Sequence, residues 1–261
     1  MTKIPSLSYN AMFKAVFSNN KYILSKLVEA ILDYYKIDID IKDKEIIIKN
    51  SELPIDNYLD RSLICDYIIK LDNYHEINIE INRSRYIGLM ERNMPYSFKI
   101  FCEHFKVGDN YNKFNDYTLL QVNFNNFSNP NGKNINRYYM IDIDDIENRL
   151  SNSYSIMNID IEKCFKFVYN NSNLEGISDL EKWAAIIFSD NLEDIASILE
   201  RGMISMSKES KENFLKDIKE KSTDKDVLDN LKLENIDYDT ISKITSKSIK
   251  DIKKIEKSMK D

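Results

Sequence analysis

Residues 75–82 read HEINIEIN, with an isoleucine at every second position and a polar residue between. This period of two predicts a half-buried strand with one apolar and one polar face. The polar face carries Glu76, Asn78, Glu80 and Asn82. Such a row is either a solvated surface or one wall of a metal site.

The preceding apolar segment, residues 62–71 (SLICDYIIKL), is rich in β-branched residues and predicts a second strand. With residues 72–74 as the loop, the two strands form a hairpin in which Asp66 lies directly opposite Glu80. The Cβ atoms of such a pair lie only about 5 Å apart. Two carboxylates at that spacing repel each other unless a cation or a proton intervenes.

Two interpretations of this pair stay open. In the first, Asp66 and Glu80 hold Mg²⁺, which prefers oxygen ligands, and Asn82 lies beside the metal. In the second, the hairpin has a wet outer face, an arginine satisfies Asp66, and Glu80 is a plain surface residue. Glu76 and Asn78 lie toward the turn, so we expect both to be surface residues.

The rest of the chain mixes helical and strand periods, which predicts an α/β fold with a mixed sheet flanked by helices. From residue 205 onward the sequence is highly charged and poor in aromatic residues. We therefore expect one domain over residues 1–204 and a small helical appendage over 205–261. The other expected helices cover 9–36 (broken near 18–20), 86–106 (kinked or split at Pro95) and 178–202, and the other expected strands cover 44–49, 117–124 and 136–143. Residues 239–255 are expected to form either a helical tail packed on the domain or a hairpin of two short helices.

The composition excludes several classes of function. The net charge of −6 argues against a general polyanion binder. Three cysteines and two histidines argue against a disulfide framework or a Cys/His zinc site. No signal peptide, membrane span or glycine-rich nucleotide loop is evident, so we expect a cytoplasmic protein without a membrane partner. The cysteines, His75, His104 and Trp183 are expected to be structural.

A local basic stretch stands out against the acidic total. Residues 83–113 contain six basic and three acidic side chains. This segment is either an ordinary amphipathic helix or a contact for a phosphate backbone. In the second case the DNA- or phosphate-binding candidates are Arg83, Arg85, Arg92 and Tyr96. Arg92 could instead orient a carboxylate, and Tyr96 could simply pack.

The pattern D66-x13-E80-x-N82 resembles motifs II and III of the PD-(D/E)XK nucleases. It is closest to the branch of PD-(D/E)XK nuclease family transposases, which includes the recombination-promoting nucleases. Further elements of that branch follow in order along nearly the whole chain: Phe13-Lys14, Asp66, Ile79-Glu80-x-Asn82, Arg92 with Tyr96, Gly108 with Tyr111, and Leu180-x-x-Trp183.

The resemblance implies a restriction-endonuclease-like core and a DNA endonuclease that depends on Mg²⁺ or Mn²⁺. Asp66 and Glu80 would hold the metal, and Asn82 would position the water. DNA is the implied partner, with transposition, recombination or defence as the implied role. Assembly is left open, with a homodimer as one option.

Two departures from the family pattern concern the auxiliary residues. Asn10 stands where the family usually has an acid, and Asn82 stands where the superfamily has lysine and this branch often has glutamine. Lys14 and Glu29 are further auxiliary candidates, with Glu29 a replacement for the missing acid. Both departures keep a rival hypothesis open, namely a non-catalytic DNA-binding or protein-interaction module on a degenerate nuclease scaffold.

Overall fold

The computed structural model divides the chain into two compact units, which are residues 1–38 with 161–261 and residues 39–160. We call them the helical unit and the sheet unit, and each is described by itself. The structure describes residues 2–37, 39, 41, 46–49, 65–84, 89–104, 108, 110, 112, 116–172, 174, 176–201, 204–233, 248 and 250.

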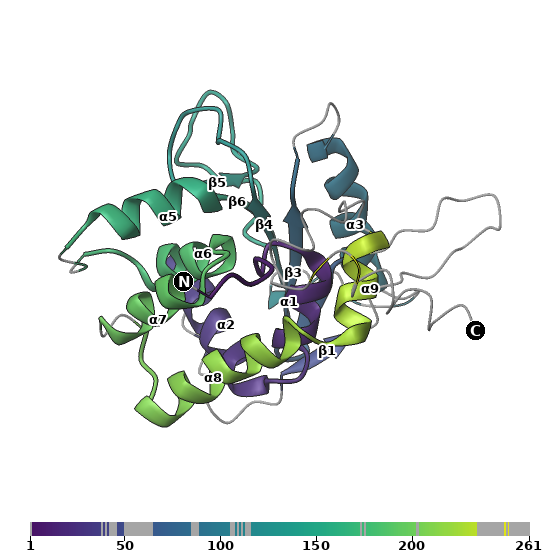
Figure 1. Ribbon diagram of the computed structural model, residues 1–261. Helices are drawn as coiled ribbons and strands as arrows, with labels where there is room; N and C mark the ends of the chain where they lie inside the picture. Colours follow the sequence, from purple (N-terminus) through teal and green to yellow (C-terminus); the bar gives the residue numbers. More distant parts are fainter. Residues whose placement is uncertain are drawn as a thin grey trace. The chain divides into compact units, whose positions relative to one another are not determined.

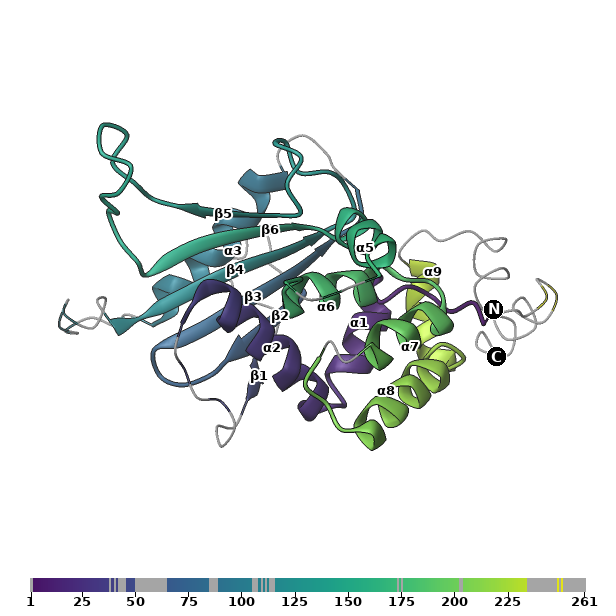
Figure 2. The same cartoon turned by 90° about the vertical axis from the view of Figure 1, so that its left-hand side faces the viewer.

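The sheet unit holds one six-stranded mixed sheet in the order β1-β2-β3-β4-β6-β5 (Figures 1 and 2). The first three strands pair antiparallel, β3, β4 and β6 pair parallel, and β5 returns antiparallel to β6. The prediction of an α/β fold with a mixed sheet is confirmed. The strands are β1 (Ile47–Lys49), β2 (Tyr67–Lys70), β3 (His75–Asn82), β4 (Thr118–Asn125), β5 (Ile135–Tyr139) and β6 (Tyr154–Asp160).

The β2–β3 hairpin has the predicted register, with Tyr67 opposite Ile79 and Lys70 opposite Glu76. A side chain fixes the turn, because Asp72 Oδ1 accepts hydrogen bonds from the main-chain N–H groups of residues 74 and 75, both at 2.8 Å. This local closure sets the loop length and therefore the register. Residues 62–64 of the predicted strand lie outside the described residues, and within the described part the strand begins after Asp66 and ends at Lys70.

The prediction of a half-buried β3 with a wet face is wrong. Every residue of β3 after His75 is buried, and Glu76 and Asn78 are 1% and 0% exposed. The reason is that β3 lies inside the sheet and the helix α3 (Leu89–Glu103) contacts the polar face through side-chain hydrogen bonds to β4. Periodicity within one strand does not reveal such a cover.

The polar face changes character along its length. Near the β2–β3 turn, Ile68, Leu119 and Tyr154 from the strands pack with Tyr96 and Ile100 from α3 in one buried cluster. At the opposite end the same face is lined by acids and carboxamides. α3 runs past Pro95 as one helix, so the predicted split at that proline does not occur.

The other face of the sheet is apolar. Ile77, Ile79, Val122, Phe124 and Met157 alternate with the polar residues and are fully buried. The isoleucines of HEINIEIN therefore have the core role that their period predicts.

Past β5 the chain forms an arm, residues 140–150, that extends from the sheet before β6 begins (Figure 2). An isolated bridge between Ile141 and Arg149 closes it. Ile143, Ile146 and Leu150 are largely exposed on this arm. The predicted strand 136–143 is therefore too long by several residues, because the chain leaves the sheet after Tyr139.

The helical unit contains elements that the sequence patterns missed or merged. The helix α5 was not predicted, nor was the strand β6 of the sheet unit that precedes it, and the single helix predicted over 178–202 is two helices. The first of these helices ends at Phe188, and Asn191 caps the second, since its side chain accepts a hydrogen bond from Glu193 N–H. The helices of this unit are α1 (Asn10–Phe17), α2 (Lys21–Tyr35), α5 (Ile161–Asn170), α6 (Asp179–Phe188), α7 (Leu192–Glu200), α8 (Lys208–Lys221) and α9 (Lys225–Leu233).

An aromatic group forms part of the core of the helical unit. The Trp183 ring lies 6.0 Å from Phe17 and 5.8 Å from Phe214, measured between centroids. This confirms the structural role predicted for Trp183. The predicted boundary at residue 205 stays a prediction, and the predicted hairpin over 239–255 falls almost wholly outside the described residues.

At the end of the sheet near the β2–β3 turn, the buried Glu76 carboxylate contacts a histidine, a lysine and a tyrosine. The Glu76 carboxylate lies 3.0 Å from His104 Nε2 and 3.3 Å from Lys49 Nζ, and Tyr117 donates its hydroxyl hydrogen to it at 3.3 Å. Burial pushes the pKa of Glu76 up, but His104 and Lys49 outweigh it, so the pKa lies below its usual value. Burial, followed by the Glu76 charge, raises the pKa of Tyr117.

We expect Glu76→Gln to lower the free energy of unfolding at pH 7 by about 2 kcal/mol, because charged hydrogen bonds to the buried carboxylate are lost. A carboxyl whose pKa is lowered in the folded state stabilises it above the usual value of 4.5. That contribution disappears as the pH falls through the lowered value.

Urea unfolding followed by circular dichroism between pH 3 and 7 measures this effect. The variant should show a flatter pH dependence than the wild type on the acidic side. Glu103→Gln is the matched control, because Glu103 lies 3.7 Å from the same lysine but is partly exposed. Equal effects of the two substitutions would contradict the assigned role of the buried carboxylate.

Candidate active site

Asp66 and Glu80 meet where β2 begins. Asp66 Oδ2 accepts a hydrogen bond from Ile81 N–H at 2.8 Å, and Asp66 N–H donates to Glu80 Oε1 at 3.3 Å. Each carboxylate is therefore anchored by main chain from the facing segment. Glu80 is buried and Asp66 is half-buried. The structure brings the two predicted acids together, as the hairpin register requires.

Asn82 lies two residues beyond Glu80 on the same face of β3. It is buried, and its Nδ2 donates to Asn125 Oδ1 on β4 at 2.9 Å. This bond directs the amide nitrogen along the sheet, so the amide oxygen is the atom that a ligand or water would meet. Asp160, at the end of β6, is paired in register with Asn125.

Carboxamides continue this polar face across three strands. Asn78, Gln121, Asn123 and Asn158 are all buried and form hydrogen bonds in series. The sequence analysis missed all but Asn78, which it placed on the surface. The missed signal was the alternation in residues 119–126 (LLQVNFNN), which is in phase with HEINIEIN and places a second polar row beside the first.

The structure describes the side chains of two of the four predicted phosphate contacts, Arg83 and Tyr96. Arg83 is exposed immediately after β3. Tyr96 is buried in the cluster with Ile100 and Leu119. Arg92 lies on α3, but its side chain is outside the described part of the structure, as is the whole of Arg85. The binding roles of these four residues stay predictions.

The auxiliary candidates lie in the helical unit. Asn10 is the first residue of α1, and Lys14 lies in the last turn of that helix. Glu29 on α2 accepts a hydrogen bond from Lys26 Nζ at 2.7 Å, so its carboxylate already has a basic neighbour. Their contribution to a site around Asp66 stays a prediction.

The donor set of the sheet unit fits a hard cation with few protein ligands. Asp66 and Glu80 supply carboxylate oxygens, and Mg²⁺ usually takes one or two carboxylates while waters and phosphate complete its shell. The buried Asn125 Nδ2 has no hydrogen-bond partner in the described part of the chain; it is a donor that a water or a phosphate oxygen could meet, not a metal ligand. Among the described residues, no three His, Cys, Asp or Glu side chains are grouped to hold a metal.

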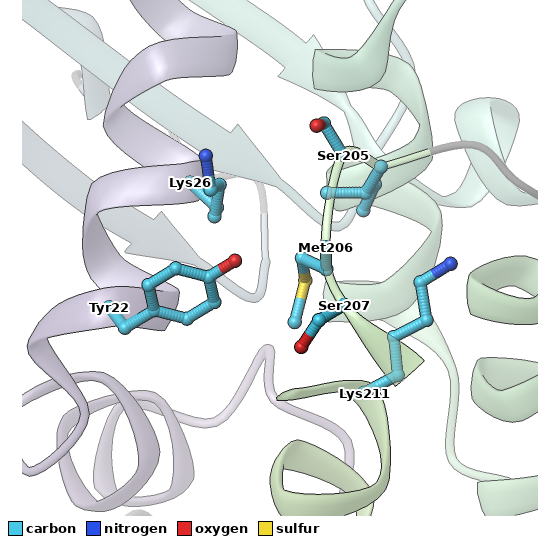
Figure 3. A pocket seen from close by; sticks show the side chains of 7 residues that line it. Tyr22, Lys26, Ser205, Met206, Ser207 and Lys211 are labelled. Atoms are coloured by element: carbon cyan, nitrogen blue, oxygen red, sulfur yellow. The ribbon is translucent and has the colours of Figure 1, made fainter. Parts of the chain in front are cut away.

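A pocket of about 440 Å³ lies in the helical unit, between α2 and the segment that leads into α8 (Figure 3). Tyr22 and Lys26 face Met206 and Ser207 across it. Ser207 also caps α8, accepting a hydrogen bond from Ser210 N–H. None of the predicted site residues lines this pocket, whose full lining is Tyr22, Lys26, Ile204, Ser205, Met206, Ser207 and Lys211.

The remaining polar candidates are structural. His104 contacts Glu76 and lies against the Tyr117 ring, and His75 Nδ1 lies 2.8 Å from Asp72 Oδ1. Cys102 was predicted to be a core residue but is exposed, because it lies on the outer side of α3. No helix in the described ranges is long and apolar enough to cross a membrane.

The chain matches one protein-family model over most of its length. The model of the PD-(D/E)XK nuclease family transposases matches residues 9–246, which include every candidate residue of both units. Curated proteins and solved structures give no match to the chain. A match over this much of the sequence, joined to a mixed sheet with paired acids on β3 and beside β2, shows that the chain belongs to the PD-(D/E)XK nuclease family transposases.

Proposed function

We propose that the protein is a divalent-metal-dependent DNA endonuclease that hydrolyses phosphodiester bonds, with Asp66, Glu80 and Asn82 at its active site. The observation that carries this proposal is the hairpin register, which sets two acids opposite each other on the face that also presents Asn82. Mg²⁺ or Mn²⁺ is the expected ion.

In this proposal each residue has a separate role. Asp66 and Glu80 would hold the ion, which when bound would polarise the scissile phosphate and acidify a water. Asn82 would orient the attacking water through its amide oxygen, because Asn125 holds its nitrogen. Arg83, exposed directly after Asn82, would bind the DNA backbone, with Arg85 and Arg92 as further contacts.

The rival function is a non-catalytic DNA-binding or protein-interaction module on the same scaffold. It is favoured by the small number of grouped acids among the described residues and by Asn82, which lacks the charge of the superfamily lysine. A cytoplasmic location and a homodimeric assembly stay expectations from the sequence.

Asp66→Asn and Glu80→Gln test the metal carboxylates. Both variants keep an oxygen that accepts the observed main-chain hydrogen bond, so the fold contact survives while the charge is lost. We expect each to lower Mg²⁺-dependent nicking of supercoiled plasmid by about 100-fold or more.

Glu76→Gln is the control for this assay, since it alters another buried acid of the same strand. It should retain nicking at a temperature where it is folded. Activity unaffected by both site substitutions, or absent with Mg²⁺ and with Mn²⁺, would favour the rival module.

Asn82→Leu tests the water-positioning role. We expect it to lower kcat about 100-fold, because an unoriented water reacts more slowly, while the metal concentration needed for half-activity stays the same. Asn82→Gln keeps the carboxamide and should retain most of the activity. Single-turnover cleavage over a metal titration separates these quantities, and a shift in metal requirement alone would contradict the role.

Arg83→Ala tests the backbone contact. Removing one phosphate contact should weaken DNA binding and reduce the salt dependence of log K by about one. Fluorescence anisotropy of a labelled duplex at several salt concentrations measures both. Lys208→Ala, an exposed cation in the helical unit, is the comparison. An unchanged slope for Arg83→Ala would remove this residue from the binding surface.

A further inference from the structure

The carboxamide row on the polar face has a single direction. Asn78 Nδ2 donates to Gln121 Oε1 at 2.7 Å, Gln121 Nε2 donates to Asn123 Oδ1 at 2.7 Å, and Asn123 Nδ2 donates to Asn158 Oδ1 at 2.8 Å. The nitrogens of Asn78, Gln121 and Asn123 therefore point away from β3 or along β4, and the oxygens of Gln121, Asn123 and Asn158 accept. One carboxamide cannot turn over without breaking its neighbour's bond.

α3 reinforces this direction at the centre of the row. Ser97 donates its hydroxyl hydrogen to Gln121 Oε1, and Asn93 Nδ2 donates to Asn123 Oδ1 at 3.1 Å. Gln121 Oε1 thus receives donors from β3 and from α3. Such convergence fixes an amide orientation that a single bond would leave ambiguous.

The row ends at the candidate metal ligand. Asn78 Nδ2, already directed by Gln121, lies 3.4 Å from Glu80 Oε1, the same oxygen that receives Asp66 N–H. If Gln121 did not hold it, Asn78 could turn its amide oxygen toward the carboxylate, and two oxygens would repel. The row therefore determines that Glu80 meets a donor.

We infer that Gln121 is a positioning residue for Glu80, acting through Asn78. The inference rests on the proposed function, because it assigns a supporting group to a ligand of the proposed metal. Groups that orient metal ligands typically change metal affinity by about 10- to 100-fold when removed. Gln121 sits on β4, away from the D-x13-E-x-N pattern, and has no role in that motif.

The experiment measures Mn²⁺ binding by the full chain without DNA, using the electron paramagnetic resonance signal of the free ion. Gln121→Met and Asn78→Leu should each weaken binding about 10-fold. Because both substitutions act through the same contact to Glu80, the double variant should bind Mn²⁺ no more weakly than the single variant with the lower Mn²⁺ affinity. Effects that add in the double variant would overturn the inference.

Asn129→Ala is the structural control. Asn129 is also a buried asparagine of the sheet unit, and its side chain donates to the main-chain carbonyls of residues 133, 134 and 158. It should lower Tm without changing Mn²⁺ affinity. If Gln121→Met does not fold by circular dichroism, Asn78→Leu carries the test alone, since the inference requires its 10-fold loss.

The outcomes separate this inference from the proposed function. Wild-type binding that Asp66→Asn abolishes, with affinity unchanged in Asn78→Leu and Gln121→Met, overturns the inference and leaves the nuclease proposal standing. If the wild type binds no Mn²⁺, or if Asp66→Asn leaves the binding unchanged, both the inference and the nuclease proposal are overturned. A loss in Asn129→Ala equal to that in Gln121→Met shows a purely structural effect and overturns the inference.

Discussion

The antiparallel pairing of β2 with β3 is the constraint on which the candidate site depends. A three-residue turn, closed by the Asp72 side chain, sets the register, and the register sets Asp66 against Glu80. A slip of one residue would send one acid to the apolar face, among Ile77 and Ile79. The proposed metal site therefore depends on a turn at the other end of the hairpin, because that turn sets the register of the two strands.

Burying the polar face carries a free-energy cost that hydrogen-bond partners offset. An unpaired carboxamide in such a place costs about 1–3 kcal/mol. The structure reduces this cost by sharing donors and acceptors across three strands and α3, while Asn78 Oδ1 and Asn125 Nδ2 have no partner among the described residues. The two acids of this sheet face have different partners, since Glu76 contacts His104 and Lys49 while Glu80 contacts amide donors.

The sequence was sufficient to predict the fold class, the hairpin and the pairing of its acids, because each follows from local period and loop length. It was insufficient for the burial of Glu76 and Asn78, because burial depends on β4 and α3, which are distant in the chain. β6 was missed because residues 154–160 (YSIMNID) mix apolar and polar positions without clear alternation.

The place of the single tryptophan has a practical consequence. Trp183 is fully buried beside Phe17 and Phe214 in the helical unit, whereas Asp66 and Glu80 belong to the sheet unit. Intrinsic emission from the indole will therefore monitor the helices and be blind to local loosening around the acids. Variants in the sheet need a second probe, such as hydrogen exchange of the main-chain amides of β2 and β3, before an unchanged emission spectrum is taken as proof of an intact protein.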